Sequence, residues 1–134
     1  MLATGYTLTR TTALPFADAV ERVRAELGQE GFGVLCEIDV QANLERKLGV
    51  HREPYIILGA CNAPLAHRAL CAEPELGALL PCNVAVYRHE GNTRISAVDP
   101  ERMLSIVDND ALAPMAEEVK RRLELVVERA SVES

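Results

Sequence analysis

The chain has 134 residues, of which 49% are hydrophobic and 25% charged, a composition that is ordinary for one soluble globular domain spanning 1–134. Acidic residues outnumber basic residues by 20 to 14, and the formal net charge of −6 provides no attraction to nucleic-acid phosphates. No run reaches the roughly 18 to 20 apolar residues that a membrane-spanning helix needs. We therefore expect a compact, ordered protein that binds neither nucleic acid nor membrane.

The cellular compartment is inferred from the start of the chain and from its cysteines. Residues 1–12 lack the basic start, apolar core and small-residue cleavage site of a secretory signal. We therefore expect a cytoplasmic protein whose four cysteines stay reduced. A structural disulfide framework is not expected in that compartment.

The first part of the chain shows strand and helix patterns in turn. A period of two over 5–11 predicts a short, half-buried strand. Pro15 opens a helix to about residue 29, because apolar residues then recur at three- and four-residue spacing. Alternation returns over 32–40, which predicts a second strand, and a short helix is expected over 41–48.

The segment 54–60 is continuously apolar. In a run this short, that pattern favours a strand buried on both faces at the centre of a sheet. Asn62 is placed to cap the following helix, which carries Pro64 near its first turn and ends around Glu73.

The remaining segments complete the predicted fold. Alternating runs at 84–89 and 93–98 flank the turn 90–92 and predict a β-hairpin. The segment 100–107 has no clear pattern, whereas 114–130 has the spacing of an amphipathic helix. The element order predicts an α+β fold, a two-layer sandwich whose single, mainly antiparallel sheet of about five strands carries two principal helices on one face.

Two cysteines are each followed by asparagine where an apolar run meets a turn: Cys61-Asn62 and Cys82-Asn83. If Cys61 ends a strand and Asn62 caps a helix, the thiol lies near the helix N-terminus, whose partial positive charge favours a thiolate. If the strand beginning at Cys82 neighbours the one ending at Cys61, both sulfurs share one end of the sheet. They would then pair, bind a soft metal or bracket a small ligand. The alternative is that both pack in the core as small hydrophobic residues.

A metal site needs three or four converging ligands. His67, six positions after Cys61 on the predicted helix, is a candidate third ligand beside Cys61 and Cys82. The two cysteines are too far apart in sequence to match the close ligand pairs of zinc fingers. A metal site therefore requires that the fold bring these residues together. Cys36 and Cys71 are expected in the core without a chemical role.

Sequence motifs for the common enzyme classes are missing. The chain contains no Gly-rich phosphate loop, no Gly-x-Ser-x-Gly nucleophile turn and no His-Glu-x-x-His zinc motif. No reaction and no cofactor are therefore assigned, and whether the protein is an enzyme stays open.

Several segments along most of the chain together form a specific pattern. They are Gly31-Phe32-Gly33-Val34-Leu35, Glu37-Ile38-Asp39-Val40, Lys47-Leu48-Gly49, Tyr55-Ile56-Ile57-Leu58-Gly59-Ala60-Cys61-Asn62, Leu79-Leu80-Pro81-Cys82-Asn83-Val84, and Asp99-Pro100 followed by Met103. The chain thereby resembles the domain of unknown function family 302, a set of small bacterial and archaeal proteins. It differs in having Ala63 before Pro64, where the family usually has proline directly after the first Cys-Asn.

The resemblance implies a two-layer α+β domain, similar to half of the TATA-binding-protein fold and often found as a homodimer. It implies no nucleic-acid binding, because a fold does not carry a function with it. The family has no established activity, but its pattern is built around the two Cys-Asn pairs. The resemblance thus implies that Cys61, Asn62, Cys82 and Asn83 form one ligand-binding site.

Three hypotheses about function stay open. The first is a domain that binds a small molecule or reacts through a thiol, with Cys61 activated, Cys82 as its partner, and Asn62 and Asn83 orienting the ligand. The second is a metal-binding or metal-dependent protein that uses Cys61 and Cys82. The third is an assembly module without chemistry, a homodimer in which the edge strand at 5–11 pairs across a twofold axis.

Overall fold

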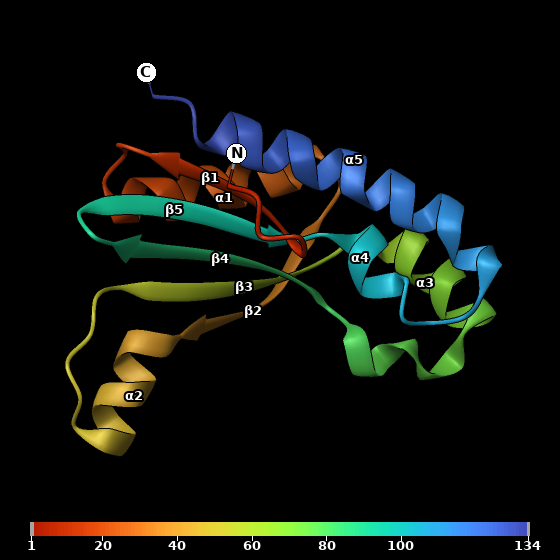
Figure 1. Cartoon of the computed structure of the whole chain (residues 1–134), viewed down its shortest axis with the longest axis horizontal. Coiled ribbons are helices and arrows are strands. Elements are labelled where there is room, and N and C mark those ends of the chain that lie inside the picture. The colour runs from red at the N-terminus through yellow and green to blue at the C-terminus, as the bar shows by residue number, and fades with distance from the viewer. Residues whose placement is uncertain (1, 134) are drawn as a thin grey trace.

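A sheet of five antiparallel strands organises the chain, which the computed structural model describes over residues 2–133 (Figure 1). The first and last residues of the expected 1–134 domain lie outside the described residues. The spatial order is β1-β5-β4-β3-β2, and every neighbouring pair is antiparallel. The strands are β1 Thr7–Thr12, β2 Gly33–Asp39, β3 Tyr55–Cys61, β4 Cys82–His89 and β5 Asn92–Val98. The predicted α+β class and single antiparallel sheet are confirmed.

Two long helices, α1 and α5, lie over one face of the sheet, as predicted, and the shorter helices gather at its ends (Figure 1). The helices are α1 Phe16–Gln29, α2 Val40–Leu48, α3 Ala63–Ala72, η1 Pro74–Leu79, α4 Pro100–Leu104, η2 Asp110–Leu112 and α5 Ala113–Ala130. The segment without a clear pattern contains α4, which starts because the Asp99 carboxylate accepts hydrogen bonds from the backbone N–H groups of Glu101 and Arg102. None of the helices in residues 2–133 is long and apolar enough to cross a membrane.

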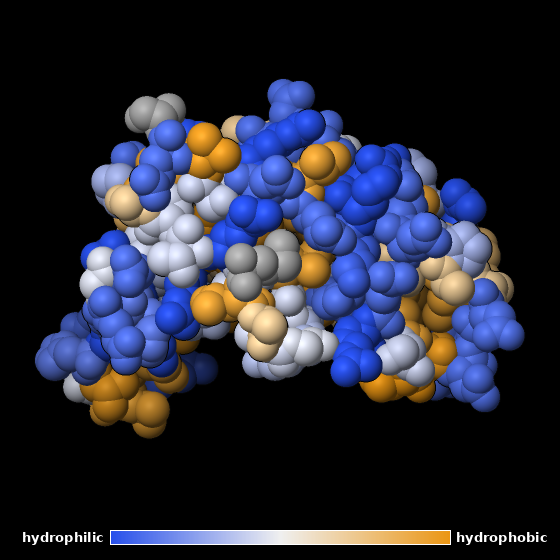
Figure 2. Space-filling view, turned by 45° about the horizontal axis from the view of Figure 1, so that its top comes forward, coloured by the Kyte–Doolittle hydropathy of each residue, from blue (hydrophilic) through white to orange (hydrophobic). Residues whose placement is uncertain are grey.

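The main core lies between the sheet and the two long helices. Val23 and Leu27 of α1 and Leu123 of α5 are fully buried against Val84 and Val86 of β4. Burying each such side chain contributes about 1.5–3 kcal/mol, so this layer dominates the stability of the fold. The outer face of α5 is hydrophilic, whereas hydrophobic side chains are exposed at the lower left of Figure 2, where α2 lies.

A second, smaller hydrophobic cluster lies beyond the end of the sheet. It consists of the buried residues Ala69 of α3, Leu76 of η1, Leu112 of η2 and Met115 of α5. Since α5 also supplies Leu123 to the main core, this one helix belongs to both clusters. The chain therefore has two packed regions joined by a shared helix.

Cys36 and Cys71 were expected in the core, and both are exposed. Cys36 lies on the sheet face opposite α1 and α5, where its sulfur packs against Gly59 of the neighbouring strand. A Cβ atom at Gly59 would lie 2.6 Å from the Cys36 sulfur and 2.9 Å from the ring of Pro81, so glycine is required there. The expectation was wrong because the helices cover only one face of β2, and because Cys71 is on the outer side of α3.

Candidate functional site

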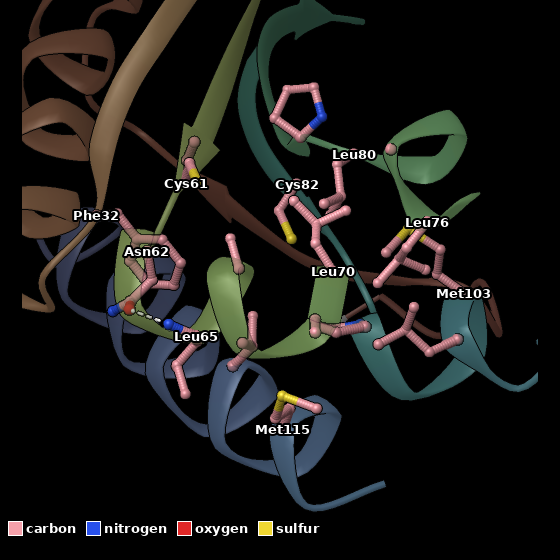
Figure 3. A pocket seen from close by; sticks show the side chains of 18 of the residues that line it. Phe32, Cys61, Asn62, Leu65, Leu70, Leu76, Leu80, Cys82, Met103 and Met115 are labelled. Carbon is pink, nitrogen blue, oxygen red and sulfur yellow. Dashed lines mark hydrogen bonds between the residues drawn. The ribbon is translucent and has the colours of Figure 1, made fainter. Parts of the chain in front are cut away.

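A cavity of about 340 Å³ lies where the two hydrophobic clusters meet (Figure 3). Phe32, Ala60 and Cys82 line it from the main core, and Leu76 and Met115 line it from the smaller cluster. None of the described residues that line it carries a charged side chain. We name this space the apolar cavity, and it has the size and lining of a pocket for a small apolar molecule.

The structure brings Cys61 and Cys82 to the wall of the apolar cavity from neighbouring strands (Figure 3). Cys61 is the last residue of β3 and Cys82 is the first of β4. The antiparallel register pairs Ala60 of β3 with Cys82, the first residue of β4. Cys61 is the next residue of β3 and lies just beyond this last pair. Cys61 is half-buried and Cys82 is buried.

The two thiols have different surroundings. Burial, together with the nearby Cys61, raises the pKa of Cys82 to about 11. Cys82 therefore stays a neutral thiol near pH 7 and cannot act as a nucleophile there. Cys61 directly precedes the capping residue of α3 and is the more accessible of the two.

Asn62 is committed to the start of α3, as the sequence predicted. Its side-chain oxygen accepts a hydrogen bond of 3.3 Å from the backbone N–H of Leu65, and only 7% of the residue is exposed. Its amide nitrogen lies 3.1 Å from the position a Cβ atom would take on Gly31, which has a φ of +81°. Asn62 thus positions the helix that forms one wall of the apolar cavity.

Asn83 lies apart from the other three predicted site residues. In β4, Cys82, Val84 and Val86 are buried toward the helices, while Asn83 between them is exposed on the opposite face. Successive side chains inside a strand point to opposite sides, so Asn83 points away from the cavity that Cys82 lines. The two Cys-Asn pairs are therefore alike in sequence but not in surroundings.

His67 does not line the apolar cavity with Cys61 and Cys82. His67 is exposed on α3, where its Nε2 lies 3.9 Å from the sulfur of Cys71. Among residues 2–133 there is no group of three or more His, Cys, Asp or Glu side chains placed to hold a metal ion. The metal hypothesis therefore finds no ligand set in the described part of the chain.

Several cavity residues escaped the sequence analysis. Met103 and Leu104 come from α4, in the segment without a clear pattern, and Leu76 comes from η1 between two predicted elements. Met103 was named only as part of the family pattern, and Leu76 and Leu104 carry no signal beyond being apolar residues in short segments. Such segments bury side chains through tertiary contacts, which periodicity does not detect.

Fold and cavity together define a small α+β domain with an apolar pocket at one end of an antiparallel sheet. The family model described as "Domain of unknown function DUF302" matches residues 8–130, and the chain belongs to this family. The crystal structure of an uncharacterized conserved DUF302 protein from Bacillus stearothermophilus is similar, with 30% identity and a TM-score of 0.89 over 95% of this chain and 99% of that one. No functionally curated protein matches the chain.

The two asparagines are expected to differ in their contribution to stability. Asn62→Ala should lower the free energy of unfolding by about 1 kcal/mol, because it removes the cap of α3. Asn83→Ala should change it by less than about 0.5 kcal/mol, because Asn83 is exposed and forms no cap. Urea unfolding of the two variants beside the parent measures both values, and equal losses would contradict the separate roles.

Alkylation by iodoacetamide is expected to separate the four cysteines. At pH 8, Cys36 and Cys71 should react fastest because they are exposed, and Cys82 slowest because it is buried and protonated. The Cys82 rate should keep rising up to about pH 11 instead of levelling off at the ordinary pKa of 9.0. Peptide mass spectrometry gives the rates, urea-unfolded protein is the control, and a plateau near pH 9 in folded protein would refute the raised pKa.

Proposed function

We propose that the protein binds a small, uncharged, largely apolar molecule in the apolar cavity. The single observation that carries this proposal is an unfilled space of about 340 Å³, lined without a charged side chain, at the junction of two hydrophobic clusters. Protein interiors normally pack as densely as organic crystals. An unfilled apolar space costs contact energy that a ligand of matching shape would restore.

The positions of the two thiols indicate which end of the proposed ligand is the more polar one. Cys61 and Cys82 lie at the sheet end of the apolar cavity, while Met103 of α4 and Met115 of α5 line it away from the sheet (Figure 3). A ligand with one weakly polar or polarizable group directed at the sulfurs suits this distribution. Carboxylates and amines are disfavoured, because no described lining residue offers an opposite charge.

Thiol reactivity is assigned to Cys61 within the same proposal. Cys61 is half-buried and lies beside the helix start, whereas Cys82 is buried and has a pKa raised to about 11. With an α,β-unsaturated carbonyl ligand, the Cys61 sulfur would form a bond to the β-carbon as the carbon–carbon π bond breaks. The thiol proton would end on the α-carbon, so the addition needs no further reactant.

Filling the cavity tests the binding proposal. The neutral fluorescent probe N-phenyl-1-naphthylamine should bind the parent saturably, one molecule per chain. Ala66→Phe should weaken binding about 10-fold or more, because Ala66 on α3 lines the apolar cavity. Ala63→Phe is the matched control, since Ala63 is exposed one turn earlier on the same helix and does not line the cavity.

The outcomes of this test are distinct. Equal binding to the parent and both variants, with circular dichroism showing intact folding, would place the probe elsewhere and overturn the proposal. Native mass spectrometry of freshly purified protein, set beside its denatured mass, adds an independent result. Extra mass that disappears on denaturation would identify a retained ligand.

A second role, assembly as a homodimer, is favoured by exposed apolar side chains on one edge of the molecule. Ile38 is 42% exposed on β2, Leu48 is 69% exposed at the end of α2, and Val50 follows at 44%. Hydrophobic side chains gather in this region in Figure 2. The edge strand β1 is less suited to pairing, because the backbone N–H of Leu2 already donates to the carbonyl of Thr9 at 2.9 Å.

Charges placed at the end of α2 are expected to dissociate this dimer. The parent should sediment as a dimer at micromolar concentration, and the double variant Leu48→Glu, Val50→Glu as a monomer, because carboxylates would be buried unpaired at the interface. Ile106→Glu is the control, since Ile106 is 73% exposed at another place on the surface. A parent that sediments as a monomer would refute the assembly role.

A further inference from the structure

All three tyrosines of the chain lie around a second hollow, on the sheet face that α1 and α5 leave uncovered. This space of about 340 Å³, which we name the tyrosine hollow, lies on the opposite side of the sheet from the core. Its lining includes Tyr6, Tyr55, Tyr87, Ile57, Ala85 and Arg94. The chain has no tryptophan, and both phenylalanines lie outside this hollow.

Strand register explains why the face is hollowed there. One row across the sheet consists of Tyr55, Tyr87 and Arg94, and the adjacent row has the small residues Ala85 and Ser96. Large side chains beside the small residues Ala85 and Ser96 leave a depression on an otherwise flat sheet, with Ile57 at the end of the second row. The depression is thus a direct result of which residues face each other.

One wall of the tyrosine hollow is held rigidly. The rings of Tyr55 and Tyr87 stack with centroids 4.9 Å apart and planes 14° apart. The guanidinium carbon of Arg52 lies 5.2 Å from the centroid of the Tyr55 ring, on the outer end of this stack. Burial, with the nearby Tyr87, raises the pKa of Tyr55 above the ordinary value of 10.0. Like any tyrosine, it is protonated at neutral pH, and its hydroxyl can donate a hydrogen bond.

The charge of the tyrosine hollow is opposite to that of the whole protein. Acidic residues outnumber basic ones in the chain, yet the described lining of this hollow contains no carboxylate. Arg94 forms no hydrogen bond or ion pair with any residue in 2–133, and its Nε is buried without a partner. A half-buried guanidinium without a counter-ion creates a local attraction for anions.

We propose that the tyrosine hollow binds a small organic anion, whose carboxylate or phosphate group pairs with Arg94 and whose apolar part rests on Ile57 and Ala85. Hydroxyl groups of the surrounding tyrosines supply further donors to the anion. This site is separate from the apolar cavity, which lies among the helices and has no charged lining residue. The two sites therefore select ligands of different chemistry.

Intrinsic tyrosine fluorescence reports on this site alone, because every tyrosine lines the tyrosine hollow and the chain has no tryptophan. Hexanoate and hexyl phosphate do not absorb in the near ultraviolet and serve as the carboxylate and phosphate probes. At least one should change the fluorescence saturably, and the difference between them identifies the preferred anion. The neutral isostere hexanamide should bind at least about 10-fold more weakly than the preferred anion, because it lacks the charge that pairs with Arg94.

Two variants and one control localise the binding. Arg94→Gln should weaken binding of the preferred anion about 10-fold or more, and Arg94→Lys should restore part of it by restoring the charge. Ala85→Leu should block the floor of the hollow without disturbing the core, because Ala85 lies on the uncovered face. Arg68→Gln makes the same charge change on the exposed surface of α3 and should leave binding unchanged.

Three results would overturn the proposal. They are equal binding of hexanamide and the preferred anion, unchanged anion binding by folded Arg94→Gln and Ala85→Leu, and no fluorescence change with either anion at millimolar concentration. A fluorescence change that follows protein concentration instead, with sedimentation showing a dimer that Ala85→Leu dissociates, would assign the face to a second copy of the chain. Binding of N-phenyl-1-naphthylamine to each variant tests the apolar cavity separately. A failure of the anion proposal is thereby distinguished from a failure of the apolar-ligand proposal.

Discussion

The pairing of β3 with β4 is the constraint on which both candidate sites depend. Its register sets Ala60 opposite Cys82, which brings the two site thiols to one end of the sheet. The same register sets Tyr55 opposite Tyr87 five pairs away, which builds the aromatic wall on the other face. A shift of one residue would exchange the faces of every side chain in the strand and would abolish both sites together.

Helix α5 explains how a chain of this size leaves an apolar space unfilled. It is long enough to pack Leu123 against the sheet and Met115 against the smaller cluster beyond the sheet. Residues of both clusters line the space at their junction, and neither cluster fills it. Most of the buried side chains belong to the larger cluster, so it supplies most of the stability of the fold.

The two faces of the sheet present different chemistry at a short separation. On the helix side, a partly open and uncharged cavity favours apolar molecules and offers sulfur as its distinctive group. On the uncovered side, Arg94 and three phenols favour an anion. Alternation along a strand makes this division unavoidable, since neighbouring residues such as Cys82 and Asn83 must serve opposite faces.

The expectation of a central strand buried on both faces at 54–60 was wrong, because β4 is the middle strand and β3, next to the edge strand β2, is covered by helices on one face only. Periodicity and turn residues in the sequence alone determined the order of the elements, the α+β class and the cap at Asn62. These are local properties, since spacing, caps and turns depend on residues close together in the chain. Only the tertiary structure decided that Cys61 and Cys82 share a cavity while Asn83 does not, and that Tyr6, Tyr55 and Tyr87 meet around Arg94. Those relations depend on strand order and register, which bring together residues far apart in sequence and leave no local pattern.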